Sequence, residues 1–190
     1  MFTVAKRKII HNQDLVSRNN FNINFTGEKL DQVDFDLFMA IKHLCSFTYI
    51  GDEVKFPLAD IIRHLNIKNS TANRKLILQR ALRLRNANFL TKVENHNIRL
   101  IIFKSFNFNK IKNKYYFNIQ FNKDISVLFD KYSKINLEQR RNLKSNLAKW
   151  LHCYWSSYKN ISKISAAKLK ALCGSQAGKY EFNKMLRKAF

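Results

Sequence analysis

Residues 57–106 read PLADIIRHLNIKNSTANRKLILQRALRLRNANFLTKVENHNIRLIIFKSF and contain the pattern that decides the fold. The first part follows the period of a short amphipathic helix that begins at Pro57, a residue suited to the first turn of a helix. A second helix follows, for which Asn69 or Ser70 is the expected N-cap. The stretch therefore begins with two helices separated by a short turn.

The remainder of this stretch predicts a β-hairpin. Apolar and polar residues alternate in residues 89–95 and again in residues 97–106, with the turn around His96. Upstream, residues 30–47 have apolar positions at helical spacing, and the alternation of residues 21–25 predicts a short strand. Three helices followed by a two-stranded hairpin is the order of a winged-helix domain.

The helical part of this order occurs twice in the chain. A strand and a short helix in residues 114–129 complete the first domain, which we place at residues 1–132. Residues 133–190 then contain a long helix with an apolar stripe, a short helix in residues 165–174 and a basic helix in residues 178–190. We therefore expect an α+β, mainly helical fold of two tandem winged-helix units, in which the second unit lacks its C-terminal wing hairpin.

The charge distribution points to a polyanionic partner. The 190 residues include 35 Lys and Arg but only 13 Asp and Glu, a net charge of +22. Residues 131–190 have a net charge of +12, whereas seven of the thirteen acids lie between Glu28 and Asp60. An AT-rich coding sequence would also enrich lysine, but it would enrich glutamate as well. The imbalance favours nucleic acid as the partner, and the more basic second unit as the part that grips it.

Nucleotide, metal and catalytic sites are not predicted. Residues 174–179, GSQAGK, have one residue too few between the glycines for a phosphate-binding loop, and Tyr180 replaces the required Ser or Thr. The three cysteines lack the spacing of a zinc site or a disulfide framework. The carboxylates do not converge with a histidine or lysine. We expect no enzyme activity, no cofactor and no metal.

Membrane association is not predicted either. The sequence has no apolar run long enough to span a bilayer, and its N-terminus lacks the apolar core of a signal peptide. We therefore expect a cytoplasmic protein with no membrane partner.

Several phrases resemble the TrfA-type plasmid replication initiators. The opening helix TGEKLDQVDFDLFMAIKHL, the segment LQRALRLRNANF, and the run LAKWLHCYWSSYKN, KLKALCGSQ and EFNKMLRKAF are similar to motifs of that family in the same order. The likeness covers most of residues 26–190 and is most specific from Trp150 to Ser157 and from Leu172 to Ser175.

This resemblance implies more than DNA binding. Members of the family carry two tandem winged-helix domains, bind repeated double-stranded sites (iterons) at a plasmid origin, melt an adjacent AT-rich segment and recruit host replication proteins such as the replicative helicase. A monomer–dimer balance, and so a possible homodimer, is implied as well. The sequence departs from the family at Phe190, where a full second unit would continue into a hairpin. We expect either a truncated chain or a second unit without its wing.

The last helix is the predicted DNA-recognition helix. Phe182, Met185, Leu186 and Ala189 form its buried stripe, which turns the opposite face toward the major groove. On that face we expect Asn183 to read adenine and Arg187 to read guanine. The other predicted contacts, to phosphate or backbone, are Ser175, Gln176, Lys179, Tyr180, Lys184 and Lys188. A solvated basic face is the alternative interpretation.

A basic helix in the first unit supplies a second set of candidates. Arg74, Lys75, Arg80 and Arg83 are expected on its surface, where they would hold the sugar-phosphate backbone or form a dimer contact. Two other functions remain open for the same residues. A transcriptional repressor or autoregulator would use the same DNA grip. An RNA-binding protein would need exposed aromatic residues on a sheet.

Overall fold

A computed structural model describes residues 2–4, 9–15, 23–46, 48–49, 51–93, 96–124, 135–157 and 163–189 of the chain. The helices in these residues are α1 (Gln32–Leu44), α2 (Leu58–Leu65), α3 (Thr71–Asn86), α4 (Leu137–Asn142), α5 (Asn146–Ser156), α6 (Ala166–Leu172) and α7 (Lys179–Ala189). The strands are β1 (Ile9–Leu15), β2 (Ile23–Glu28), β3 (Glu53–Pro57), β4 (Asn88–Val93), β5 (His96–Ile101), β6 (Phe103–Ile111) and β7 (Lys114–Phe121). The expected α+β class is confirmed.

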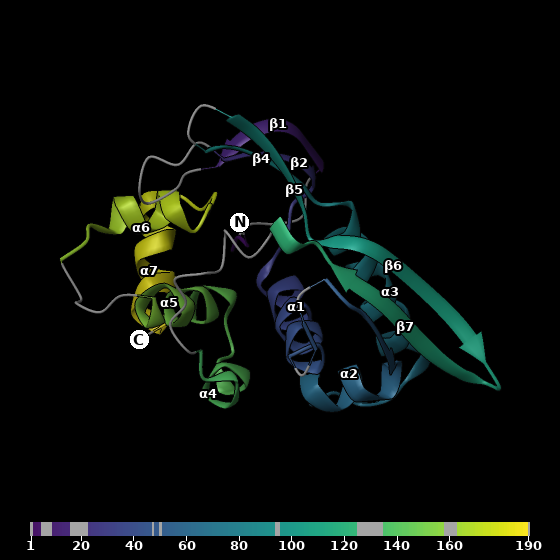
Figure 1. Ribbon diagram of the computed structural model, residues 1–190. Helices are drawn as coiled ribbons and strands as arrows, with labels where there is room; N and C mark the ends of the chain where they lie inside the picture. The colour runs from purple at the N-terminus through teal and green to yellow at the C-terminus, as the bar shows by residue number, and fades with distance from the viewer. Residues whose placement is uncertain are drawn as a thin grey trace.

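The first unit has the topology of a winged helix. Helix α1, strand β3, helices α2 and α3 and the hairpin β6–β7 follow in this order, and the three strands form a sheet in the order β3-β7-β6. The two-residue turn of the hairpin has positive φ at Lys112 (45°) and Asn113 (63°), as type I′ turns require. The hairpin extends away from the three helices (Figure 1). It is therefore the wing of this unit.

The predicted hairpin exists but is not the wing, so that assignment is wrong. Strands β4 and β5 pair from Asn88↔Ile101 to Val93↔His96, and β4 also pairs with β2 in a separate sheet of order β1-β2-β4-β5. The run of residues 97–106 is two strands, because Ile102 and Phe103 are consecutive and both buried, which interrupts the alternation. The chain crosses from one sheet to the other at this point.

Strand β3 is a second difference from the prediction. Residues 53–57 pair with β7 directly before α2, and Pro57 is the extended N-cap residue of that helix. The sequence pattern placed the start of the helix correctly at this proline. It did not separate the strand from the helix, because only Val54 and Phe56 alternate inward before it.

Two hydrophobic cores organise the chain. The first packs α1, α2 and α3 against both sheets, with Phe38, Ile61, Leu84, Phe89 and Phe117 among its most buried side chains. The second is formed by α5, α6 and α7 through Leu147, Leu151, Tyr154, Leu169, Cys173 and Phe182. In Figure 1 these helices gather on one side of the molecule, apart from α1–α3.

The predicted long helix of the second unit is two helices. Helix α4 ends at Asn142 and α5 begins after Ser145, whose Oγ accepts a hydrogen bond from the N–H of Ala148 (3.0 Å). The apolar stripe of α5 is nevertheless core, as expected. The part of the predicted segment 114–129 from residue 125 on, the boundary at residues 132 and 133, and Tyr158 at the end of the predicted apolar stripe lie outside the described residues.

The turn between α6 and α7 depends on Gly174. Its φ is +65°, and a Cβ atom at this position would lie 3.2 Å from Cγ2 of Thr3. The N–H of Ser175 donates to the carbonyl of Lys170 (3.1 Å), which completes the C-terminal cap of α6. The predicted role of this glycine, to end one helix before the next begins, is confirmed.

We predict that Gly174→Ala lowers the free energy of unfolding by about 1–2 kcal/mol, because alanine in the left-handed region brings its Cβ against backbone. Gly178→Ala is the matched control, since nothing lies within 4 Å of its Cβ position. We expect the control to change stability by less than about 0.5 kcal/mol. Urea unfolding followed by tryptophan fluorescence reports on this unit, because Trp150 and Trp155 both lie in α5. Equal losses for the two variants would contradict the prediction.

Candidate nucleic-acid interface

Two of the arginines expected on the DNA-binding surface are buried. Arg80 and Arg83 are each 7% exposed, on the inner side of α3. Arg80 Nη1 lies 2.8 Å from Asp31 Oδ1 and 2.9 Å from Asp34 Oδ1. Arg83 Nη2 lies 2.6 Å from Asp34 Oδ1, and its Nη1 lies 3.2 Å from Glu28 Oε1. The prediction that these two residues face DNA is therefore wrong.

The first turn of α1 supplies the counterions of this network. Asp31 caps the helix by accepting the N–H groups of Val33 and Asp34, and Asp34 Oδ2 accepts the N–H of Asp31 in return. Burial raises the pKa of Asp34. Burial also acts to raise the pKa of Asp31, but the N–H of Asp34 and the Arg80 guanidinium outweigh it and hold that pKa below its usual value. The acids at the start of α1 thus cap this helix and also pair with the arginines of α3.

Two of the residues predicted to contact DNA, Arg74 and Lys75, lie on the outer face of α3, whereas the contacts themselves stay predictions. Lys75 is exposed, and Arg74 is half-buried with its Nε donating to Asn69 Oδ1 (2.7 Å). Gln79 lies one turn after Lys75 and is also exposed, so it joins this face. Gln79 was not predicted from the sequence, because the candidates on this helix were chosen for their positive charge. A glutamine amide can nevertheless pair bidentately with adenine.

Helix α7 presents the face that the sequence predicted. Phe182 is 1% exposed in the second core, and Met185, Leu186 and Ala189 pack against the same core. The opposite side carries the exposed residues Lys179, Tyr180, Lys184, Arg187 and Lys188, with Asn183 half-buried beside them. Glu181 is an exposed acid in the first turn. The orientation of the helix is confirmed, whereas the contacts to bases and phosphates stay predictions.

The turn before α7 contains two further residues that were predicted to contact DNA, Ser175 and Gln176. Ser175 is half-buried, and its Oγ accepts the N–H of Ala177 (3.4 Å). Gln176 is exposed beside it. Both therefore lie near the start of α7, where a DNA backbone contact was predicted.

The wing is a basic surface that the sequence reasoning missed. Lys110, Lys112 and Lys114 are exposed around its turn, and Lys104 is exposed nearer its base. Lys110 Nζ lies 5.7 Å from the ring centroid of Tyr115 on the facing strand. The signal was present in residues 103–121, which alternate on both sides of Lys112-Asn113. It was overlooked because the wing had already been assigned to residues 89–106.

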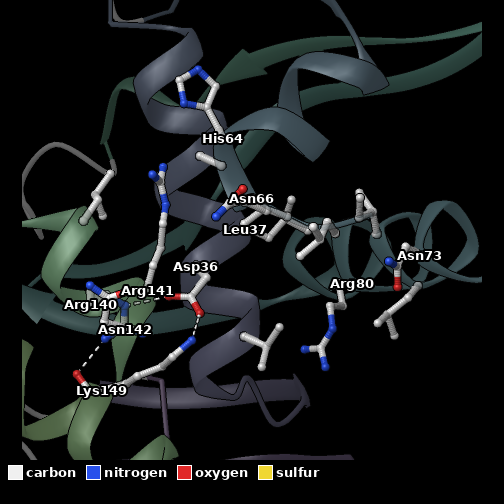
Figure 2. Close-up of a pocket in the computed structure, with 17 residues that line it drawn as sticks. Asp36, Leu37, His64, Asn66, Asn73, Arg80, Arg140, Arg141, Asn142 and Lys149 are labelled. Carbon is white, nitrogen blue, oxygen red and sulfur yellow. Dashed lines mark hydrogen bonds and ion pairs between the residues drawn. The ribbon is translucent and has the colours of Figure 1, made fainter. Parts of the chain in front are cut away.

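Arg140 is 1% exposed. It joins the two units through polar contacts with Asp36 and Lys149 (Figure 2). Its Nε donates to Asp36 Oδ1 (2.6 Å) on α1, and its Nη1 donates to the carbonyl of Lys149 (2.6 Å) on α5. The ammonium group of Lys149 reaches the other oxygen of Asp36, also at 2.6 Å. Beside these ion pairs lies a cavity of about 390 Å³ whose apolar lining includes Leu37, Leu65, Leu76 and Leu137.

Other chemistry is not assembled in the described residues. These residues contain no group of three or more His, Cys, Asp or Glu side chains placed to hold a metal ion. Burial raises the pKa of Cys45 to about 11, and it raises the pKa of Cys153 although Arg140 opposes the change. Both thiols therefore remain protonated at neutral pH. Among the described helices, none is long and apolar enough to cross a membrane.

The fold is that of a winged-helix protein of the α+β class, and two solved structures share it. The crystal structure of the RctB domains 2-3 (RctB-155-483) aligns with a TM-score of 0.71 and 12% identity, over 100% of this chain and 79% of that chain. The selenomethionine derivative of RctB domains 2 and 3 aligns with a TM-score of 0.69 and 10% identity, over 100% and 77%. At these identities the similarity shows the fold. No protein-family model and no curated protein sequence matches the chain.

We predict that Asp34→Ala lowers the free energy of unfolding by about 3–5 kcal/mol, because it removes the shared counterion of two buried guanidinium groups. Arg85→Ala, at an exposed position of α3, is the control and should change stability by less than about 0.5 kcal/mol. Urea unfolding followed by circular dichroism at the helical band measures both. A loss below about 1 kcal/mol for Asp34→Ala would show that the network is not needed for the fold.

Proposed function

We propose that this protein is a replication initiator that binds double-stranded DNA through winged-helix units. The proposal is supported by a winged-helix fold that is shared along the whole chain with RctB domains 2-3, together with the resemblance to the TrfA-type replication initiators. The net charge of +22 supports a nucleic-acid partner independently of the fold.

In this proposal, three surfaces of the protein contact the DNA. Helix α7 enters the major groove, where Asn183 and Arg187 read base edges and the lysines around them neutralise phosphates. The outer face of α3 contributes Lys75 and Gln79. The wing lysines contact the backbone beside the groove, and their charge adds affinity for any duplex sequence.

The resemblance to the TrfA-type initiators supports a more specific form of the proposal. In this form residues 133–190 are a second winged-helix unit, and the DNA sites are iterons at a plasmid origin. Binding then opens an AT-rich segment on which the host loads its replicative helicase. A homodimer restrains this activity, and the protein acts in the bacterial cytoplasm on plasmid DNA.

Base reading and phosphate binding are separable in two variants. We predict that Arg187→Ala weakens binding to the specific site by roughly 1–3 kcal/mol and leaves binding to a scrambled duplex nearly unchanged. Lys110→Ala with Lys114→Ala should weaken both duplexes equally and reduce the slope of log K against log salt by about 2, since each phosphate contact contributes about 0.9. Fluorescence anisotropy across a salt series measures both effects.

Two controls accompany this comparison. Lys144→Ala removes an exposed lysine between α4 and α5 and corrects for the loss of one positive charge. Replacing Lys110 and Lys114 by arginine should restore the salt slope because the charge is kept. Unchanged affinity of Arg187→Ala for both duplexes would remove this residue from the interface.

Origin opening distinguishes an initiator from a repressor on the same scaffold. We predict that the protein, bound to its site in a supercoiled plasmid, makes thymines of an adjacent AT-rich segment reactive to permanganate. A repressor would protect the site without exposing thymines. Binding without any permanganate-reactive thymine would therefore overturn the initiator proposal while leaving DNA binding intact.

A further inference from the structure

Side chains of the two units meet in directed polar contacts. Each unit has its own hydrophobic core, and the cavity of about 390 Å³ lies between α1–α3 and α4–α5. Units joined by an interface without a large apolar area are expected to move relative to each other. The directed contacts between the units therefore bear on their relative orientation.

Arg140 provides most of these contacts. A guanidinium group has five N–H donors in a rigid plane, and Arg140 meets five acceptors. Three belong to α1: Asp36 Oδ1 at 2.6 Å, and the carbonyl and side-chain oxygens of Gln32 at 3.1 and 3.0 Å. Two belong to α5: the Lys149 carbonyl at 2.6 Å and Cys153 Sγ at 3.0 Å. One side chain thus bridges α1 and α5.

Neighbouring contacts keep this side chain in place. Its guanidinium carbon lies 4.8 Å from the ring centroid of Phe35, and Lys149 Nζ shares Asp36 at 2.6 Å. Figure 2 shows Arg140 and Lys149 converging on Asp36. We call Arg140, Lys149, Asp36 and Gln32 the Arg140 clamp. Because none of these four residues belongs to the buried hydrophobic clusters, the clamp can be weakened while both clusters keep their members.

Residues 2–4 form a second link between the units. Phe2 packs in the first core, and Val4 packs against the second. The N–H of Thr3 donates to the carbonyl of Leu30 (2.8 Å), and the N–H of Val4 donates to the carbonyl of Cys173 (2.9 Å). This link holds the start of α1 and the end of α6 near each other.

We infer that the Arg140 clamp fixes the separation and rotation of the two DNA-binding surfaces, so that the protein recognises only duplex sites whose two halves have one spacing. The inference rests on the proposed function, because it requires that α7 and the surface of α3 and the wing bind the same duplex. Arg140, Lys149 and Asp36 are positioning residues that determine spacing specificity without touching DNA.

The physical argument concerns simultaneous binding. Inserting one base pair between two half-sites rotates the second by about 34° and moves it by about 3.4 Å, since a turn of B-DNA has about 10.5 base pairs. A rigid pair of units then loses the gain from its second contact, because that gain disappears when geometry forbids simultaneous engagement. Units that are released from the clamp can reorient. They therefore keep most of the affinity that the second contact provides.

The experiment begins with selection of a preferred duplex from random sequences by the full chain. Insertions of zero, one and two base pairs between the halves of that duplex are then compared by fluorescence anisotropy.

The variants are Arg140→Met, which keeps the length of the side chain but not its charge, and Asp36→Asn, which keeps the shape and removes the shared carboxylate. Asp124→Asn removes an exposed acid outside the clamp and controls for the added net charge of Asp36→Asn. Circular dichroism checks that each variant folds. If Arg140→Met does not fold, the test rests on Asp36→Asn.

For the wild type and Asp124→Asn we expect each insertion to weaken binding by about tenfold or more, and for the two clamp variants by less than about threefold. Three results would overturn the inference: a selected site without two halves, a wild type that tolerates the insertions, or clamp variants as sensitive as the wild type. Failure of the wild type to prefer any duplex would instead count against the proposed function.

Discussion

The first two turns of α1 are the part of the molecule on which the rest depends. One side of this segment places Asp31 and Asp34 against Arg80 and Arg83, which fixes α3 across the first core. The other side places Gln32 and Asp36 against Arg140, which fixes the second unit. Because buried charges are tolerated only when paired, both networks must form together with the packing around them. A short helical segment thus orients α3 in one unit and contacts the other unit.

This arrangement divides the charged residues into two groups. The arginines of α3 and α4 that pair with α1 are structural, and their charges are neutralised inside the molecule. Exposed cations occur on α7, on the outer face of α3 and around the turn of the wing, and also on other elements such as α2, α4 and α6. The net positive charge of the exposed surface favours association with a polyanion.

Much of the fold was predictable because local signals were strong. The helix starts at Pro57 and Ser70, the turn at Gly174 and the buried stripe around Phe182 all follow from periodicity and from residues with particular backbone preferences. The wing was misassigned because two hairpins follow α3 in sequence, and alternation alone does not say which of them completes the sheet with β3. Strand pairing between β3 and β7 decides this, and those strands lie far apart in the chain.

The sequence by itself determined the α+β class, the positions of most helices, the basic character and the outward face of α7, because each depends on residues within a few turns of one another. Only the tertiary structure decided which hairpin is the wing, that Arg80 and Arg83 are buried, and that Arg140 joins the units. The sequence alone does not distinguish a cationic side chain that meets solvent from one that meets phosphate or a carboxylate. Its role is set by which acid the fold brings within hydrogen-bonding distance, and Asp36 lies more than a hundred positions from Arg140.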